Sequence, residues 1–490
     1  MRQSLLIALA CLSCSQPQVE VATPPNFLIL MSDNHSWNHV GSYGDPVVKT
    51  PNIDALAGNG IRFTQAYCSS PSCTPARASM LTGQDIWRLE EGANLWGILP
   101  AKFTVFTDLL EDAGYLVGHE GKGWGPGNYE AAGRTRNPAG EKFNSFEEFY
   151  NERERGQPFF YWFSSRDPHR PYRRDGGKKA GIDTASIDVP PYLPDHPDVR
   201  RDIADYYGEI QHFDGEVGGY LELLSEMGDV ENTIIIVASD NGWQMPRGLA
   251  NLYDAGTRLP LVISMPARFP GGRVVDDFVT LTDFAPTVLE LAGLDIPSDV
   301  TARSMVDILT SDKSGTLDPT RDFVVTARER HAYVRPGGAG YGGRALRTKD
   351  YLYIRNYEPD VWPAGDPPLF GDVDSHMLHY PAPTKILMLK DRGPLFELAF
   401  GKRPAEELFD IAKDPHQMTN LASNPDYQET KQQLSQQLTD YLTETGDPRE
   451  TGGEMKWIGA KYFAEKDFHP EPSEEAREIL GLEERYSWVD

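Results

Sequence analysis

Residues that could do chemistry are densest in one segment, Cys73–Gln84, which reads Cys-Thr-Pro-Ala-Arg-Ala-Ser-Met-Leu-Thr-Gly-Gln. Pro75 suits the first turn of a helix, so the segment predicts a helix that begins at the cysteine, with Arg77 one turn further on. A helix N-terminus presents unpaired N–H groups and the positive end of the helix dipole. We therefore expect this end to suit an anion and to favour the thiolate form of Cys73.

A second chemical signal is the tripeptide Ser-Asp-Asn, which occurs at residues 32–34 and again at 239–241. Each copy directly follows an apolar run, 27–31 or 234–238, that has the length of a buried strand. Asp-Asn pairs often simply form turns after strands, and either copy alone would fit that interpretation. Together they offer carboxylate and amide oxygens that suit Ca²⁺, with Mg²⁺ less expected. The candidate metal ligands are Asp33, Asn34, Asp240 and Asn241.

The elements that must position these residues are predicted to be parallel strands. A third apolar run, 159–163, precedes the polar segment 164–172, and amphipathic helical stretches lie between the runs, the clearest near 200–227. In α/β sheets, ligands bind beyond the carboxyl ends of the strands, so the three polar segments should converge there. After about Pro319 the pattern changes to a hairpin around residues 349–350 and a polar helix near 427–443, typical of a smaller α+β domain.

The Cys73 segment also resembles the signature of the type I sulfatases, Cys-x-Pro-x-Arg-Ala-Ser-x-Leu-Thr-Gly. The resemblance implies an alkaline-phosphatase-like α/β sandwich, in which a large, mainly parallel mixed sheet lies between helices, plus a smaller C-terminal α+β domain with an antiparallel sheet. It implies that a formylglycine-generating or anaerobic sulfatase-maturating enzyme oxidises Cys73 to formylglycine, whose hydrate attacks sulfur. The two Asp-Asn pairs would hold the divalent cation, although Asn34 stands where the family usually has an aspartate.

The same resemblance assigns further catalytic residues. Lys122, in Gly-Lys-Gly, would contact the sulfate together with Arg77, and His169 would protonate the leaving group. The family usually has a second histidine where this chain has Trp124. His35, next to the first Asp-Asn pair, is a candidate to replace it.

Four arginines are candidates for binding substrate. Arg170 and Arg173 belong to a basic cluster within residues 166–179, which is either a subsite for a polyanion or a solvated loop. Arg247 lies two positions from Leu249, where the family usually has a basic residue, and Arg258 occupies a position typical of the family, where it could instead fix the loop.

Motifs such as 167–170, 239–242 with 251–253, and 407–410 with 414–416 and 420–422 resemble the sulfamidase (N-sulfoglucosamine sulfohydrolase) branch, over most of residues 26–447. We therefore expect a sulfatase that hydrolyses sulfate esters or sulfamates on a sulfated oligo- or polysaccharide. A phosphonate or phosphate monoester hydrolase shares the cysteine signature and remains an alternative. A glycan-binding protein with a decayed site is another, for which Asn34 and Trp124 are the reasons.

Length, composition and charge limit the possible domain organisation and partners of the chain. The 490 residues and 39% hydrophobic content indicate a globular chain that forms one large and one small domain, and the net charge of −26 argues against nucleic acid as a partner. Residues 1–23 resemble an export signal with a polar tether, in which Cys11 or Cys14 could carry a lipid anchor. The expected location is the periplasm, the outer membrane as a lipoprotein, or the extracellular space. We place the catalytic domain at 24–320 and the smaller domain at 321–490.

Overall fold

The computed structural model of the chain describes residues 24–373, 382–464 and 477–478. The expected export signal and tether, with Cys11 and Cys14, lie outside the described residues. Among the described helices, none combines the length and the hydrophobicity that crossing a bilayer requires.

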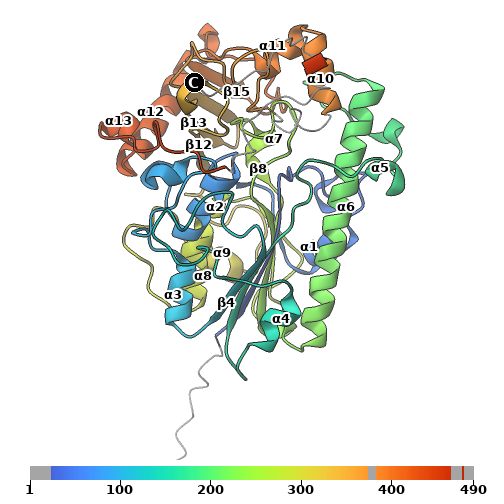
Figure 1. Ribbon diagram of the computed structural model, residues 1–490, viewed down its shortest axis with the longest axis vertical. Coiled ribbons are helices and arrows are strands. Elements are labelled where there is room, and N and C mark those ends of the chain that lie inside the picture. The colour runs from blue at the N-terminus through green and yellow to red at the C-terminus, as the bar shows by residue number, and fades with distance from the viewer. Residues whose placement is uncertain (1–23, 374–381, 465–476, 479–490) are drawn as a thin grey trace, which may run out of the picture.

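An eight-stranded sheet forms the centre of the molecule, in the strand order β10-β2-β9-β7-β1-β6-β4-β5 (Figure 1). Strand β9 runs antiparallel to both of its neighbours, and the other neighbouring strands are parallel. The sheet is therefore mixed and mainly parallel, as expected. Its strands are β1 (Asn26–Ser32), β2 (Ile61–Phe63), β4 (Leu116–Gly121), β5 (Glu141–Lys142), β6 (Phe159–Ser164), β7 (Thr233–Ser239), β9 (Leu261–Ser264) and β10 (Arg273–Val275).

Helices cover both faces of this sheet, which explains why its central strands are apolar without alternation. All seven residues of β1 are buried. Phe27 and Ile29 belong to the core beneath one group of helices, and Leu28 and Leu30 to the core beneath the other (Figure 1). The first group is α2 (Cys73–Thr82), α3 (Phe106–Asp112), α8 (Phe284–Leu291) and α9 (Val306–Thr310); the second is α1 (Pro51–Asn59), α4 (Phe146–Asn151) and α6 (Pro197–Glu226).

The helix predicted near 200–227 is confirmed as α6. His196 is its N-cap and accepts a hydrogen bond from the backbone N–H of Asp198, while Pro197 occupies the first helical position. Phe213 and Val217 are among the residues that turn its apolar face toward the sheet.

A second, four-stranded antiparallel sheet lies above the large one in Figure 1, on the side of α2 and α7 (Asp254–Thr257). Its strands are β12 (Phe323–Arg328), β13 (Gly343–Thr348), β14 (Tyr351–Asn356) and β15 (Glu406–Asp410). The predicted hairpin is confirmed by the antiparallel pairing of β13 with β14. The predicted polar helix is confirmed as α12 (Gln428–Glu444), whose Leu434, Leu438 and Leu442 pack against this sheet.

Shorter elements complete the described chain. Strands β3 (Ala66–Tyr67), β8 (Arg258–Leu259) and β11 (Val279–Thr280) form a three-stranded sheet. The remaining α-helices are α5 (Gly176–Lys179), α10 (Pro383–Lys390), α11 (Pro394–Phe400) and α13 (Pro448–Thr451).

Candidate active site

The ends of three neighbouring strands bring the polar segments together. Ser32 of β1 pairs in register with Ser239 of β7, so Asp33 and Asp240 leave the sheet side by side. On the other side of β1, the backbone N–H of Asp33 donates to the carbonyl of Asp167, 2.9 Å away, in the loop that follows β6. The predicted convergence at the carboxyl edge of the sheet is therefore confirmed.

Helix α2 begins at Cys73, as predicted, and directs this residue into the same place. The Sγ atom lies 3.7 Å from Asp33 Oδ1 and 3.6 Å from Asn241 Nδ2, and the residue is only 4% exposed. The expected thiolate is wrong for this thiol, because burial, with the charges of Asp240 and Asp33, raises its pKa to about 12 despite the nearby Lys122. The helix N-terminus does not outweigh two adjacent carboxylates.

The two predicted carboxylate ligands lie together with Cys73. One ligand atom from each of Asp33, Cys73 and Asp240 lies within 4.8 Å of the others. The side-chain oxygens of Asn34 and Asn241 are buried and have no hydrogen-bond partner among the residues that the structure describes. Buried amide oxygens rarely stay unsatisfied, so two of them beside two carboxylates fit a hard cation such as Ca²⁺.

Two cationic side chains neutralise these carboxylates. Lys122 Nζ lies 2.8 Å from Asp33 Oδ2 and 3.8 Å from Asp240 Oδ2, and Arg77 Nε lies 2.8 Å from Asp240 Oδ2. Burial would raise the pKa of Asp33, but the charges of Lys122, His169 and Arg77 lower it below its usual range.

Hydrogen bonds hold most of the Arg77 guanidinium rigidly, and one of its nitrogens has no partner among the described residues. Its Nη1 donates to the carbonyl of Gly123 at 2.7 Å and to Ser164 Oγ at 2.6 Å, and its guanidinium lies over the ring of Trp162. Its Nη2 is buried and has no partner among the described residues. A donor of this kind beside a site for a cation can bind an anionic oxygen.

His169 lies at the rim of the same site. The residue follows β6, is half-buried, and its Nδ1 contacts the carbonyl of Arg170. Burial lowers the pKa of His169, which the carboxylate of Asp33 raises and the charge of Lys122 lowers. The charges of Asp33 and Lys122 are therefore close enough to His169 to affect its pKa.

Neither residue considered for the second histidine position lies in the site. Trp124 is 2% exposed and belongs to the core on the α2 side of the sheet. The ring of His35 is buried, contacts Ser32 Oγ and the carbonyl of His39, and packs edge-on against Phe213 of α6. The expectation that His35 replaces the missing histidine is not supported, because its ring is used on the α6 side of the sheet.

Two of the four arginines proposed for substrate binding instead form hydrogen bonds with other groups inside the protein. Arg170 forms two hydrogen bonds with the buried carboxylate of Asp202, at 2.8 and 2.7 Å. Arg247 donates to the carbonyls of Leu398 and Gln417, and its guanidinium lies 3.8 Å from the ring centroid of Tyr253. We therefore do not assign either guanidinium to substrate.

The other two arginines are placed differently. Arg173 has a side chain that is 53% exposed, although it also pairs with Asp167 and Glu209. Arg258 donates to the carbonyl of Thr64 and lies over the ring of Trp37, which fixes the loop before β9. Only Arg173 keeps a surface position, within the basic segment 166–179.

One histidine near the site is not indicated by any motif or pattern in the sequence. His331 follows β12 in the smaller domain, and its Nδ1 lies 2.9 Å from the hydroxyl of Ser72, next to Cys73. Its position depends on contact between segments more than 250 residues apart, so neither strand patterning nor motif spacing could reveal it.

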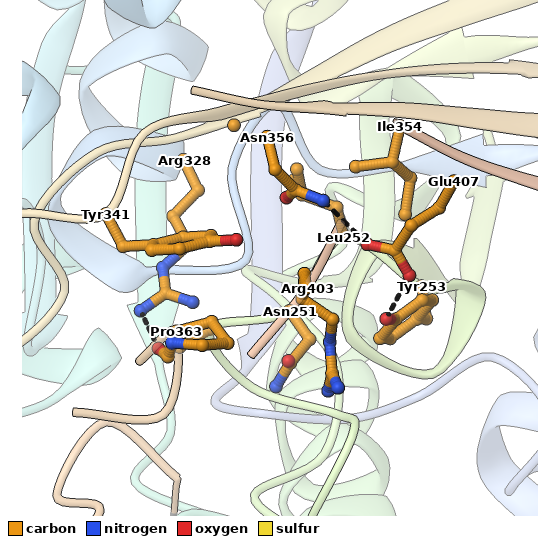
Figure 2. A pocket seen from close by; sticks show the side chains of 12 residues that line it. Asn251, Leu252, Tyr253, Arg328, Tyr341, Ile354, Asn356, Pro363, Arg403 and Glu407 are labelled. Atoms are coloured by element: carbon orange, nitrogen blue, oxygen red, sulfur yellow. Dashed lines mark hydrogen bonds between the residues drawn. The ribbon is translucent and has the colours of Figure 1, made fainter. Parts of the chain in front are cut away.

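The loop that follows the second Asp-Asn pair joins the two sheets. Figure 2 shows a small pocket between this loop, at Asn251–Tyr253, and strands β14 and β15. In it, the hydroxyl of Tyr253 donates to Glu407 at 2.7 Å, and the amide of Asn356 donates to the same carboxylate at 2.8 Å. These motif residues hold the smaller domain against the catalytic loop.

Comparison with known proteins gives two family matches and several relatives. Residues 25–294 match the family model described as Sulfatase, and residues 246–363 match the model described as N-sulphoglucosamine sulphohydrolase, C-terminal. An ulvan-active sulfatase of Formosa agariphila is 26% identical, over 91% of this chain and 81% of its own. Human N-sulphoglucosamine sulphohydrolase is 27% identical, over 87% of this chain and 91% of its own.

Solved structures share the fold at low sequence identity. One, determined in complex with its substrate D-glucosamine-2-N,6-O-disulfate, has a TM-score of 0.66 at 18% identity and covers 88% of this chain and 100% of its own. A phosphonate monoester hydrolase from Silicibacter pomeroyi has the same TM-score at 17% identity, over 90% of this chain and 100% of its own. At such identities, the likeness concerns the fold alone.

Proposed function

The chain belongs to the sulfatase family, and from that premise we propose that it hydrolyses sulfate ester or sulfamate groups on a sulfated carbohydrate. The observation that carries the proposal is that Cys73, two carboxylates, two unsatisfied amide oxygens and two cationic side chains meet at one sheet edge, and all of them except the half-buried Lys122 are buried. Relatives named for ulvan and for N-sulphoglucosamine support a sulfated glycan as the substrate class.

Asp33, Asn34, Asp240 and Asn241 would hold the cation, with Ca²⁺ favoured over Mg²⁺ because Ca²⁺ accepts flexible sets of several protein oxygens, whereas Mg²⁺ usually keeps several of its waters. A bound dication supplies Lewis-acid stabilisation of charge at the sulfuryl group. Asp33 and Asp240 would then balance the dication, which leaves the charges of Arg77 and Lys122 to balance the sulfate. Arg77 Nη2, which has no partner among the described residues, is the donor best placed to donate a hydrogen bond to a sulfate oxygen.

Formylglycine, once formed from Cys73, supplies a hydrated aldehyde whose hydroxyl oxygen is the nucleophile toward sulfur. Arg77 and Lys122 would hold the sulfuryl oxygens and stabilise their growing negative charge, a preorganised electrostatic contribution. His169 would donate a proton to the leaving oxygen or nitrogen as its bond to sulfur breaks, a role typically worth ~10²–10⁴ in rate. The remaining hydroxyl then gives its proton to the now neutral His169, the C–O bond to the sulfated oxygen breaks, and sulfate leaves as the aldehyde forms again, which water converts back to the hydrate.

Outside this centre, we propose that Arg173 and the exposed cations near it bind the polyanionic chain of the substrate. We also propose that the protein is exported, to the periplasm, the outer membrane or the medium. Lipid attachment at Cys11 or Cys14 would show as acyl mass on an N-terminal peptide from the native host.

The test is a substrate comparison on protein co-produced with a maturation enzyme. The substrates are an aryl sulfate, N- and O-sulfated heparin fragments, ulvan oligosaccharides, and an aryl phosphate and phosphonate. We expect release of sulfate from at least one glycan, complete loss in Cys73→Ala, and retention in the matched control Cys68→Ala.

Faster cleavage of the phosphate or phosphonate than of every sulfate would instead assign the monoester hydrolase activity. Full-length native protein that keeps an unmodified Cys73 and hydrolyses none of these substrates would assign a glycan-binding role. Mass spectrometry of the Cys73 peptide distinguishes these outcomes, because conversion of thiol to aldehyde changes its mass.

A further inference from the structure

His331 belongs to the smaller domain and contacts Ser72, the residue before Cys73. Its Nδ1 lies 2.9 Å from Ser72 Oγ, across 259 positions of sequence. The residue is 4% exposed, so this contact is part of the packed interior and not a chance approach of two surface side chains.

The hydroxyl of Ser72 is free for this contact because of the helix that follows it. Ser72 is the N-cap of α2, but its side chain makes no capping hydrogen bond. An N-cap hydroxyl normally accepts from the N–H at the second or third helical position, and the third position here is Pro75, which has no N–H. The serine therefore orients the imidazole in place of capping the helix.

The backbone on both sides of His331 is also fixed. The N–H of Arg330 donates to Asn94 Oδ1 at 3.1 Å, and the N–H of Ala332 donates to Asp372 Oδ1 at 2.9 Å. Asp372 is itself held by Arg328 and Arg335, at 2.7 and 3.0 Å. A side chain held in this way is preorganised for contact with a ligand.

The second ring nitrogen is left for such a ligand. Only Nδ1 of His331 has a hydrogen-bond partner among the described residues, so Nε2 is available to bind a ligand. Burial, with the charges of Arg328, His169 and Lys122, lowers the pKa of His331 to about 4 although the charge of Asp372 raises it, which indicates a neutral ring close to the site.

We propose that His331 is a substrate-binding residue, whose Nε2 forms a hydrogen bond with a hydroxyl of the sugar that carries the sulfate. It would contact the leaving-group side of the substrate, near His169, where Trp124 has only a core position. The proposal rests on the proposed function and adds the smaller domain to the residues that select the sugar.

The experiment compares His331→Ala, His331→Gln and Ser72→Ala on a sulfated disaccharide and on an aryl sulfate, which has no sugar hydroxyl. His196→Ala, which removes the N-cap of α6 and no residue assigned to the site, is the control for a loss of stability without a loss of substrate contacts. Rates are divided by the formylglycine content from mass spectrometry, because Ser72 adjoins Cys73. Thermal melting reports any loss of folding.

We expect His331→Ala to lower kcat/KM for the disaccharide about tenfold, mainly through KM, and to change the aryl sulfate less than about threefold. His331→Gln should recover part of the loss, because its amide can reach the position of Nε2. Ser72→Ala should lose less kcat/KM for the disaccharide than His331→Ala, and His196→Ala should keep the wild-type kcat/KM.

His331→Ala could lose kcat/KM equally on both substrates, with the same losses in Ser72→Ala. That result would mean that His331 only supports the start of α2 and would overturn the proposal. An unchanged kcat/KM in His331→Ala on the disaccharide would also overturn it, while leaving the sulfatase function intact. Wild-type protein that carries formylglycine but hydrolyses no sulfate would reject the proposed function and this inference together.

Discussion

At the scale of single residues, the most informative atoms are the amide oxygens of Asn34 and Asn241. Both are buried without a hydrogen-bond partner among the described residues, although Asn34 Nδ2 donates to Gln244 Oε1 at 3.2 Å. An unsatisfied acceptor in the interior costs about 1–3 kcal/mol, which a cation ligand would recover. The substitution of Asn34 for the usual aspartate thus keeps the ligand oxygen and removes one charge.

The first prediction concerns this ligand. After treatment with EDTA, Asn34→Ala should bind Ca²⁺ about tenfold or more weakly than the wild type, while Asn34→Asp should bind at least as tightly. Calorimetric titration with Ca²⁺ measures both, and Asn59→Ala, an exposed change on α1, is the control. Equal affinity in Asn34→Ala and wild type would exclude Asn34 from the ligand set.

A second prediction concerns pH and stability. Burial raises the pKa of Asp85 from 3.8 to about 6, and the residue is close to the hydroxyl of Tyr441 on α12. The folded state binds this proton more tightly than the unfolded state, so this contribution is full below pH 3.8 and is lost as the pH rises through about 6. Asp85→Asn should be more stable than wild type at pH 7.5, by on the order of 3 kcal/mol.

Chemical denaturation of both proteins from pH 4 to 8 measures that difference. The gap between the two curves should widen with rising pH up to about 7 and then stay constant. A gap that does not vary with pH would show that Asp85 has an ordinary pKa in the folded protein.

At the scale of elements, the end of strand β4 positions Lys122. Gly121 adopts a φ of +75°, and a Cβ on it would lie 2.1 Å from the carbonyl oxygen of Ser164, its partner on β6. Because the backbone of β6 cannot move away without disturbing the site, this position requires glycine for space as well as for conformation.

The third prediction follows from that contact. Gly121→Ala should lower kcat/KM for any cleaved sulfate more than tenfold, because it displaces Lys122. Gly114→Ala is a matched control, since Gly114 also has a positive φ, +90°, but nothing lies within 4 Å of its added Cβ. The control should lose about 1 kcal/mol of stability and keep its activity. Similar activity in both variants would contradict a steric role for Gly121.

The sequence predicts these elements well wherever burial sets the pattern. The apolar runs of β1, β6 and β7 have both faces covered, so their length and their polar ends are visible without any tertiary information. The thiolate expectation for Cys73 failed because a helix N-terminus is a local signal, whereas burial and two carboxylates from other strands determine the pKa.

At the scale of the whole molecule, the contact between the two sheets is the feature that motif spacing could not reveal. Figure 2 shows that Glu407 of β15 accepts from Tyr253 and Asn356 at the boundary between the catalytic loop and the small sheet. His331 and Asp372 belong to the same side of that boundary. The alkaline-phosphatase-like fold itself could be expected from family resemblance, but which residues of the smaller domain reach the site depends on docking of the two sheets.

The fourth prediction tests the energetics of that docking. Tyr253→Phe removes a donor from the buried carboxylate of Glu407 and should cost about 1.5–3 kcal/mol of unfolding free energy. Tyr427→Phe, which removes a contact with Asp410 inside the smaller domain, should cost less than about 1 kcal/mol. Urea denaturation measures both. A smaller loss in Tyr253→Phe than in Tyr427→Phe would mean that the boundary contact does not stabilise the fold.

The 4% exposure of Cys73 also constrains the order of events during biosynthesis. A modifying enzyme must enclose the side chain it oxidises, and within the part of the chain that the structure describes Cys73 is buried once α2 has packed against the sheet and Ser72 contacts His331. Oxidation would therefore have to occur on the nascent or newly translocated chain, in competition with its own folding. A host that folds this protein quickly and oxidises it slowly would accumulate folded molecules that a maturation enzyme could activate only after they unfold.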